Sequence, residues 1–437
     1  MIAIPATAQI LIVFAAVVAA TARKVPLGLA AAAGGVALAL WRGVPAREML
    51  GSAAAAALSA DTLLLLALMT CIMAFSSAMK RSSLMDAFAA SLSAAVRSER
   101  LSMALAPAII GTLPVPGGAV LSAPLVDAMD PGRSRGAATL SAANYWFRHT
   151  LELSWPLYPA FILTSSLTGI EPSRLMILNA YAPVALFALG LLFILPGARA
   201  DARGAERAGV GPRGDSGSAR LADLVRGVAP LGIVLGAYGL LAGLWAALSP
   251  ALAIGAAASA LVGRYAPVFV GIACGAAYVA TRPTGRGAFK GSLGPSTLRL
   301  LTMMLGIKVF SALVGAAGAA EAAAAELAGA GFEPLVAIAL LPFMAGLVTG
   351  VGFGYAGLAF PIIMRMAPDG VALGAVVVLA GAFGYAGMML SPLHVCMVVS
   401  SEHFGVGLVS TIRRFAAPLT LFCAAATGYA ALLAALG

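Results

Sequence analysis

One kind of segment occurs twice in this chain and limits the folds that are open to it. The first copy, Leu105–Val126, reads LAPAIIGTLPVPGGAVLSAPLV, and the second, Leu340–Ile363, reads LLPFMAGLVTGVGFGYAGLAFPII. Each has two short apolar arms around a tip rich in glycine and proline. The arms are too short to cross a bilayer, which takes ~20 apolar residues. We therefore predict two re-entrant hairpins that turn back inside the membrane and face each other across a binding site.

The composition places the chain in a membrane. Of 437 residues, 61% are hydrophobic and 10% are charged, and the mean hydropathy is +0.98, whereas soluble domains carry roughly 25% charged residues. The net charge of +10 is interpreted as the positive-inside bias of a membrane protein and not as a nucleic-acid signal. The four cysteines stand singly, without CxxC or Cys/His ligand spacing, so neither a disulfide nor a metal site is predicted.

Basic turns between the apolar stretches predict the topology. Arg23–Lys24, Lys80–Arg81 and Arg413–Arg414 should be cytoplasmic, which places both termini outside the cytoplasmic membrane. The second half repeats the plan of the first: three spans, a hairpin and two further spans. The hairpin proline and the proline of the next broken span are 49 residues apart in the first half (156 − 107) and 50 in the second (392 − 342). Because the copies enter from opposite sides, this is an inverted repeat.

This repeat divides the chain into segments. The predicted parts are scaffold helices at 1–100 and 227–333, transport-domain halves at 101–196 and 334–437 with broken helices at 137–169 and 371–401, and a hydrophilic cytoplasmic linker at 197–226. An interfacial helix is predicted at Ser83–Arg100, and a further helix break at Arg264 and Pro267.

Three motifs carry a resemblance: LPVPGGAVLSAPLVDAM, NYWFRHTLELSWPLYP and GLVTGVGFGYAGLAFP. With them the sequence resembles domain of unknown function 401, a family of uncharacterised integral membrane proteins, over most of the chain. The plan is also similar to that of the ion transporter superfamily, which includes dicarboxylate, citrate, gluconate and arsenite carriers. That resemblance implies an all-α polytopic fold with about ten transmembrane helices and two re-entrant hairpins, a homodimer held by scaffold helices, and an elevator-type transport domain.

The hairpin tips supply the first group of predicted binding residues. These are Thr112, Pro114, Pro116, Gly117, Gly118 and Ser122 in the first copy, and Thr349, Gly350, Gly352, Gly354 and Tyr355 in the second. Glycine leaves backbone amides free to approach a ligand, and helix N-termini attract anions. The alternatives are that the glycines serve close helix packing, that the hydroxyls bond their own helix backbone, and that Tyr355 fills space.

The broken helices supply the second group, which is Asn144, Arg148, His149, Glu152, Ser391 and His394. A charge within an apolar span is costly and by default functional or paired, and the Arg148 guanidinium can bind a carboxylate through paired hydrogen bonds. Alternatively, Arg148 pairs with Glu152 four residues on, or lies at the cytoplasmic interface. His149, Glu152 and His394 can relay a proton, or the histidines are packing residues.

Together these features predict a secondary active transporter for a small organic anion in the lipid bilayer, coupled to H⁺ or Na⁺ and without a cofactor. H⁺ is preferred because titratable groups line the breaks, and because the tips lack the Ser-Asn-Thr triplets of the superfamily's sodium-coupled dicarboxylate carriers. The alternatives are a cation/proton antiporter, or an intramembrane enzyme that uses Ser391 and His394. No catalytic residue is assigned. No GxxxxGK[ST] loop occurs, so ATP-driven transport is not predicted.

Overall fold

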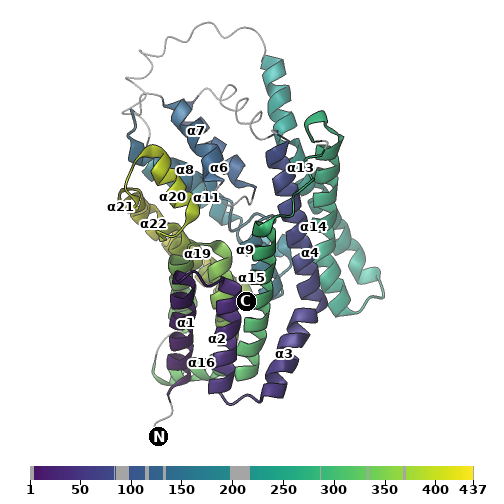
Figure 1. Ribbon diagram of the computed structural model, residues 1–437, viewed down its shortest axis with the longest axis vertical. Helices are drawn as coiled ribbons and strands as arrows, with labels where there is room; N and C mark the ends of the chain where they lie inside the picture. Colours follow the sequence, from purple (N-terminus) through teal and green to yellow (C-terminus); the bar gives the residue numbers. More distant parts are fainter. Residues whose placement is uncertain are drawn as a thin grey trace.

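The computed structural model describes residues 4–82, 84, 98–113, 118–130, 134–196, 217–285, 287–331, 334–367 and 371–436, and every element in them is a helix (Figure 1). The first half contains α1 (Ala6–Ala22), α2 (Leu27–Trp41), α3 (Ala46–Leu58), α4 (Ala60–Arg81), α6 (Glu99–Gly111), α7 (Ala119–Met129), α8 (Ala137–Arg148), α9 (Pro159–Thr168), α10 (Pro172–Leu178), α11 (Tyr181–Leu189) and the π-helix η1 (Gly190–Ile194). The second contains α13 (Gly217–Leu248), η2 (Ser249–Ala251), α14 (Ala256–Thr281), η3 (Pro283–Gly285), α15 (Pro295–Ala317), α16 (Ala319–Gly329), α17 (Pro334–Thr349), α18 (Gly352–Met366), α19 (Leu373–Leu390), α20 (Val395–Phe404), α21 (Leu408–Ile412), η4 (Arg413–Phe415) and α22 (Ala416–Ala435).

Six stretches of the described chain are long and apolar enough to cross a membrane, so the protein is a multi-pass membrane protein. They are Ala60–Arg81, Gly227–Ala251, Ala256–Thr281, Pro295–Ala317, Leu373–Phe404 and Leu408–Ala435. The pair α10 and α11–η1, bent by 41°, makes a seventh if it counts as one span. This is fewer than the ten predicted, partly because α1 and α2 have only 17 and 15 residues.

Of three local predictions about breaks and connecting segments, one is wrong and two lie mostly outside the described residues. The predicted break at Arg264 and Pro267 is wrong, because α14 runs unbroken through both. Proline is tolerated in membrane helices where neighbouring groups satisfy the freed backbone, and Arg264 has an ion-pair partner in Asp61. The predicted interfacial helix at Ser83–Arg100 lies mostly outside the described residues. So does most of the linker, whose end at 217–226 is helical and belongs to α13.

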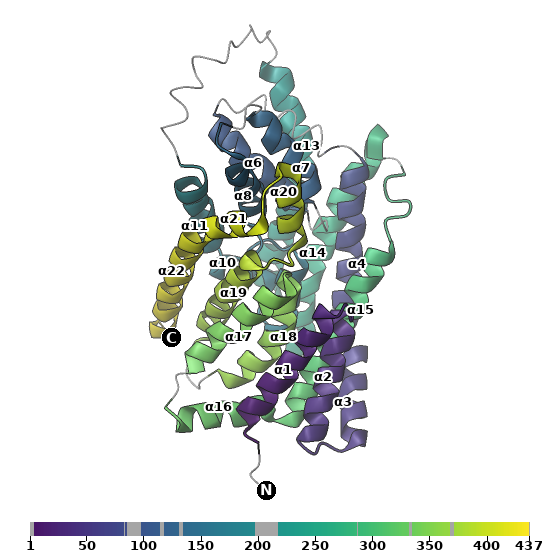
Figure 2. The same cartoon turned by 60° about the vertical axis from the view of Figure 1, so that its left-hand side comes forward.

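Both interrupted segments form pairs of short helices. In the first, α6 and α7 pack on each other around a tip of which residues 114–117 lie outside the described chain. In the second, α17 and α18 pack on each other and are separated only by Gly350 and Val351. Figure 2 shows the first hairpin in the upper part of the molecule and the second in the lower part. The hairpin arms are therefore short helices.

Two helices that are each interrupted by a turn link the hairpins. The first is α8 and α9 with a turn at 149–158, and the second is α19 and α20 with a turn at 391–394. The first hairpin packs on α8 and on α20, while the second packs on α19 and on α9. Each hairpin therefore contacts the first half of its own broken helix and the second half of the other one.

The remaining helices also make matching contacts between the two halves. Helix α2 packs on α15, and α14 packs on α4, while α1 packs on α2 and α13 on α14. These pairings correspond if α1, α2 and α4 of the first half match α13, α14 and α15 of the second. The contact pattern thus supports the internal repeat that the sequence spacing indicated.

Glycine allows helices to cross closely. A Cβ atom on Gly28 of α2 would lie 2.5 Å from the Met303 Cα atom of α15. A Cβ atom on Gly346 of α17 would lie 2.7 Å from the Met388 nitrogen of α19. Small residues let membrane helices approach backbone to backbone, and the second crossing holds a hairpin arm against its broken helix.

The N-terminus of α1 is capped by a side chain from α16. The Glu326 carboxylate accepts hydrogen bonds from the backbone N–H groups of Ala6, at 2.7 Å, and Thr7, at 2.9 Å. These donors satisfy the charged form, so the N–H of Thr7 and then that of Ala6 lower the pKa of Glu326 below its ordinary value. The cap ties the start of the first half to the second.

Candidate functional site

A cavity of about 330 Å³ lies where the two halves meet. Its walls come from the α8–α9 turn, the tip of the second hairpin, the α19–α20 turn and the start of α15. A larger cavity of about 550 Å³ between α17, α19 and α22 is lined almost entirely by apolar side chains, which suits lipid or helix contacts and not an anion. We therefore take the smaller cavity as the candidate site.

Four helices begin at this cavity. Pro159 of α9, Ser296 of α15, Gly352 of α18 and Val395 of α20 line it, and each lies in the first turn of its helix. The first N–H groups of a helix have no partner within the helix and carry partial positive charge. Their convergence makes the cavity attractive to an anion.

Arg148 ends α8 on the wall of the same cavity. Its side chain is only 4% exposed, and its guanidinium Nη2 atom lies 3.5 Å from the Leu113 carbonyl oxygen. A Cβ atom on Gly118 would overlap the guanidinium, so the side chain lies between the two ends of the first tip. The described residues contain no ion pair between Arg148 and Glu152, which was the alternative interpretation. Arg148 instead contacts the first hairpin.

Glu152 lies in the α8–α9 turn and faces the second hairpin. It is buried, at 6% exposed, and lines the cavity. A Cβ atom on Gly352 would overlap its Oε1 atom and would lie 2.9 Å from the Ala160 Cβ atom. Only glycine leaves room for the carboxylate there. One broken helix thus presents a cation to the first tip and a carboxyl group to the second.

The two histidines at the breaks contact each other. Nε2 of His394 lies 3.1 Å from Nε2 of His149, and Nδ1 of His149 lies 2.7 Å from the Tyr145 carbonyl oxygen. A carbonyl can only accept, so Nδ1 of His149 is the protonated nitrogen and donates. His394 then donates from Nε2 to His149. The sequence predicted both residues for the site but not their contact.

The second tip fits into the α19–α20 turn. Gly350 has a φ of +64°, and a Cβ atom there would lie 2.9 Å from both the His394 nitrogen and the Ser391 Oγ atom. The Ser391 hydroxyl accepts a hydrogen bond from the Leu393 N–H at 3.2 Å. Gly350 is therefore required both by its backbone conformation and by the close approach of the turn.

Replacing Gly350 with alanine is expected to destabilise the protein by about 1–3 kcal/mol, because a strained φ is combined with steric overlap. The thermal unfolding of purified protein measures the loss. Gly405→Ala is the matched control, since Gly405 has a φ of +67° but open space around it. Equal losses in the two variants would show that the contact between the tip and the turn contributes nothing.

Several predicted residues have other roles or lie away from the cavity. The hydroxyls of Thr112 and Thr349 donate to the carbonyls of Ile109, at 2.6 Å, and Ala345, at 2.7 Å, as the alternative interpretation of them held. Asn144 donates to the Ser400 hydroxyl at 2.8 Å and so ties α8 to α20. Ser122, Gly354 and Tyr355 are buried outside the cavity wall, and Pro114, Pro116 and Gly117 lie outside the described residues.

The cavity also contains residues that the sequence reasoning missed. The Tyr158 hydroxyl donates to the Gly111 carbonyl and thereby joins the α8–α9 turn to the first hairpin. Cys396 lines the cavity two residues after His394. Arg299, in the segment 227–333 that was predicted only as scaffold, lies on α15 at the cavity. Tyr158 belongs to the NYWFRHTLELSWPLYP motif, which was a usable signal, whereas Arg299 had none.

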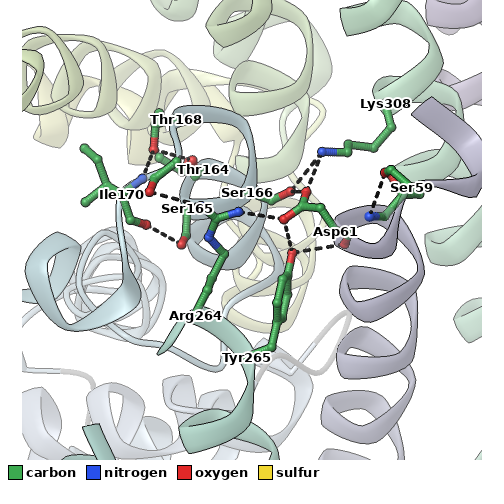
Figure 3. A network of polar contacts seen from close by, with 12 residues as sticks. Ser59, Asp61, Thr164, Ser165, Ser166, Thr168, Ile170, Arg264, Tyr265 and Lys308 are labelled. Carbon is green, nitrogen blue, oxygen red and sulfur yellow. Dashed lines mark hydrogen bonds and ion pairs between the residues drawn. The ribbon is translucent and has the colours of Figure 1, made fainter. Parts of the chain in front are cut away.

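A second polar cluster lies apart from the cavity and centres on Asp61 of α4 (Figure 3). Its Oδ1 atom accepts from Arg264, at 2.6 Å, and from the Tyr265 hydroxyl, at 2.9 Å. Its Oδ2 atom accepts from Lys308, at 2.7 Å, and from the Ser166 hydroxyl, at 2.5 Å. The cluster joins α4, α14, α15 and α9. Of its charged members the sequence analysis noted only Arg264, and it misread that residue as a helix break.

The comparison with protein families agrees with the motif resemblance. The model of the family described as "Protein of unknown function (DUF401)" matches residues 6–208 and 267–433. The chain belongs to this family. The DUF401 match includes both hairpins, both broken helices and every cavity residue named above. No curated protein matches the chain.

Proposed function

We propose that this DUF401 protein is a secondary active transporter that moves a small organic anion of the carboxylate type across the cytoplasmic membrane. The observation that carries the proposal is the cavity where four helix N-termini and the Arg148 guanidinium converge. Helix N-termini formed at interrupted membrane segments are a common way for transporters to bind anionic groups. A buried arginine within a membrane protein is expensive and by default functional.

The residues of the cavity suggest how the anion is held. Arg148 donates paired N–H groups to a carboxylate. The first amides of α18 and α20 donate to the remaining oxygens. Gly350 and Gly352 keep the second tip close to the ligand, because neither has a side chain in the way. The size of the cavity, about 330 Å³, suits a small molecule.

For coupling we propose H⁺, with Na⁺ as the alternative ion. Glu152 is a buried carboxyl group on the cavity wall. Burial disfavours a charged carboxylate that has no partner, so such a group can take up a proton and release it again. Protonation of Glu152 would weaken its attraction to Arg148 and change the affinity of the cavity for an anion. Proton and substrate are thereby linked at one site.

For the movement we propose an elevator-type mechanism on an ion-transporter-superfamily fold. Helices α1–α4 and α13–α15 would form the scaffold and hold a homodimer, with both termini outside. The hairpins and broken helices would move together, which their mutual contacts support. The exchange of contacts between the two halves supports an inverted repeat, the arrangement from which alternating access commonly arises.

Uptake by the full-length protein in proteoliposomes tests the proposal. A panel of radiolabelled mono-, di- and tricarboxylates is offered under an imposed pH gradient, an imposed Na⁺ gradient, or neither. We expect at least one carboxylate to accumulate, and the pH gradient to drive it. Uptake that depends on Na⁺ alone would show that Na⁺, and not H⁺, is the coupling ion. Absence of uptake for every anion would contradict the transporter proposal.

The Asp61 cluster favours a second candidate, a cation/proton antiporter without an organic substrate. Asp61 is a partly buried acidic group between Lys308 and Arg264, and an ionisable residue within a membrane protein is by default a functional site. The same proteoliposomes distinguish the two functions. Collapse of a pH gradient on addition of Na⁺ or K⁺, with no carboxylate uptake, would favour the antiporter.

A further inference from the structure

Three potential metal ligands meet on one wall of the cavity. Two of the three histidines in the chain, His149 and His394, lie with Cys396 so that one ligand atom of each is within 4.8 Å of the others, and all three are buried. We propose that these residues bind a divalent transition-metal ion, with Zn²⁺ as the best fit. This proposal does not depend on the transport function.

The spacing of the ligand atoms suits one ion. The two Nε2 atoms are 3.1 Å apart. A tetrahedral ion with Zn–N bonds of ~2.0–2.1 Å holds two nitrogens roughly 3.3 Å apart, and a thiolate binds at ~2.3 Å. Small side-chain movements therefore bring all three residues into coordination. A hydrogen bond between the histidines takes the place of the ion when no metal is bound.

The surroundings of His149 match those of a metal ligand. Its Nδ1 atom donates to the Tyr145 carbonyl at 2.7 Å, which leaves the lone pair of Nε2 directed at His394. Metal-bound histidines almost always donate their second nitrogen in this way, because the bond fixes the ring and raises its basicity. Nδ1 of His394 has no hydrogen-bond partner among the described residues, so either ring nitrogen of His394 is available to an ion.

Cys396 is the second residue of α20, so the start of this helix brings its sulfur close to the two imidazoles. Two imidazoles and a thiolate form a ligand set for zinc and its neighbours, and not for Mg²⁺ or Ca²⁺, which prefer oxygen. A disulfide is not an alternative partner, because all four cysteines are free.

The charges around the site predict the fourth ligand. The ion and Arg148 together carry three positive charges, which the Cys396 thiolate and, when it is ionised, the Glu152 carboxylate offset only in part. Since all three ligands line the cavity, the fourth position of a tetrahedral ion opens into it. An anion there, either hydroxide or a carboxylate, would balance the remaining charge.

Cobalt binding to the full-length protein in detergent tests the site. After treatment with a chelator, titration with Co²⁺ should give tetrahedral d–d absorption bands and a thiolate-to-cobalt charge-transfer band, saturating at about one ion per chain. Cys396→Ser should abolish the charge-transfer band, and His394→Gln should weaken binding at least tenfold. Cys423→Ser and His403→Gln are the matched controls and should leave the spectrum unchanged. A wild-type spectrum without a thiolate band would overturn the proposal.

X-ray absorption of the zinc-loaded wild-type protein needs no variant and therefore remains decisive if a variant fails to fold. The expected shell has two nitrogens and the fourth, oxygen ligand at ~2.0–2.2 Å and one sulfur at ~2.3 Å, the bond lengths of tetrahedral zinc sites in proteins. A shell of oxygen and nitrogen only would overturn the proposal. Carboxylate uptake is measured separately with chelator present, so failure of the metal site and failure of transport are distinguishable.

Discussion

Replacing Arg148 with glutamine is expected to abolish carboxylate uptake while leaving a folded protein. Removal of one partner from a desolvated charge pair costs about 2–5 kcal/mol, which is roughly 30- to 4,000-fold in affinity. The change also removes the guanidinium that the structure places against the first tip, beside Leu113 and Gly118. Initial uptake rates over a range of substrate concentrations measure the effect.

Two further variants show whether the loss comes from the site. Arg148→Lys keeps the charge but not the planar pair of donors, so it should retain part of the uptake. Arg365 lies on the surface, paired with Glu321, and Arg365→Gln should transport normally. Thermal unfolding and size-exclusion profiles check that each variant folds. Normal uptake by a folded Arg148→Gln protein would remove Arg148 from the binding site.

Replacing Asp61 with asparagine is expected to destabilise the protein by several kcal/mol, up to about 3–5 kcal/mol. The carboxylate joins Arg264 and Lys308, and its removal leaves two cations without their shared anion. Breaking a buried pair by removing one partner costs about 3–5 kcal/mol, because the remaining charge is uncompensated. Unfolding of the purified protein by denaturant in mixed micelles measures the free energy of unfolding.

An exposed ion pair provides the control for Asp61. The side chains of Arg365 and Glu321 are 43% and 49% exposed, and such pairs contribute about 0–1 kcal/mol. Glu321→Gln should therefore change the free energy of unfolding little. Similar small losses for Asp61→Asn and Glu321→Gln would mean that the Asp61 cluster is hydrated and does not hold α9 to α4, α14 and α15.

The Asp61 cluster also bears on the proposed movement. It connects Ser166 of α9, in a predicted transport-domain half, with α4, α14 and α15, in the predicted scaffold. If the halves move as proposed, these contacts break in every cycle. Transport rate and stability would then respond oppositely to a weakening of the cluster, whereas a fixed structural cluster would lose both together.

The interruptions of the chain could be located from the amino-acid sequence without a structure. Glycine and proline act on the backbone within a few residues of themselves, so the hairpins and the break near Ser391 were visible in advance. The charged and polar run from Asn144 to Glu152 likewise marked one wall of the cavity. Length and hydropathy were weaker guides, because they predicted more spans than the described residues show. Local breakers could also mislead, since Arg264 and Pro267 predicted a break in α14 that does not exist.

Which side chains meet became visible only once the helices were packed in three dimensions. His149 and His394 are 245 residues apart in sequence, and Asp61 is 203 residues from Arg264 and 247 from Lys308. Nothing local marks such partners, since their contact depends on how α4, α14 and α15 pack and on how one broken helix crosses the other. The convergence of four helix N-termini on one cavity has the same origin: each helix start follows from local sequence, but their common direction follows from packing.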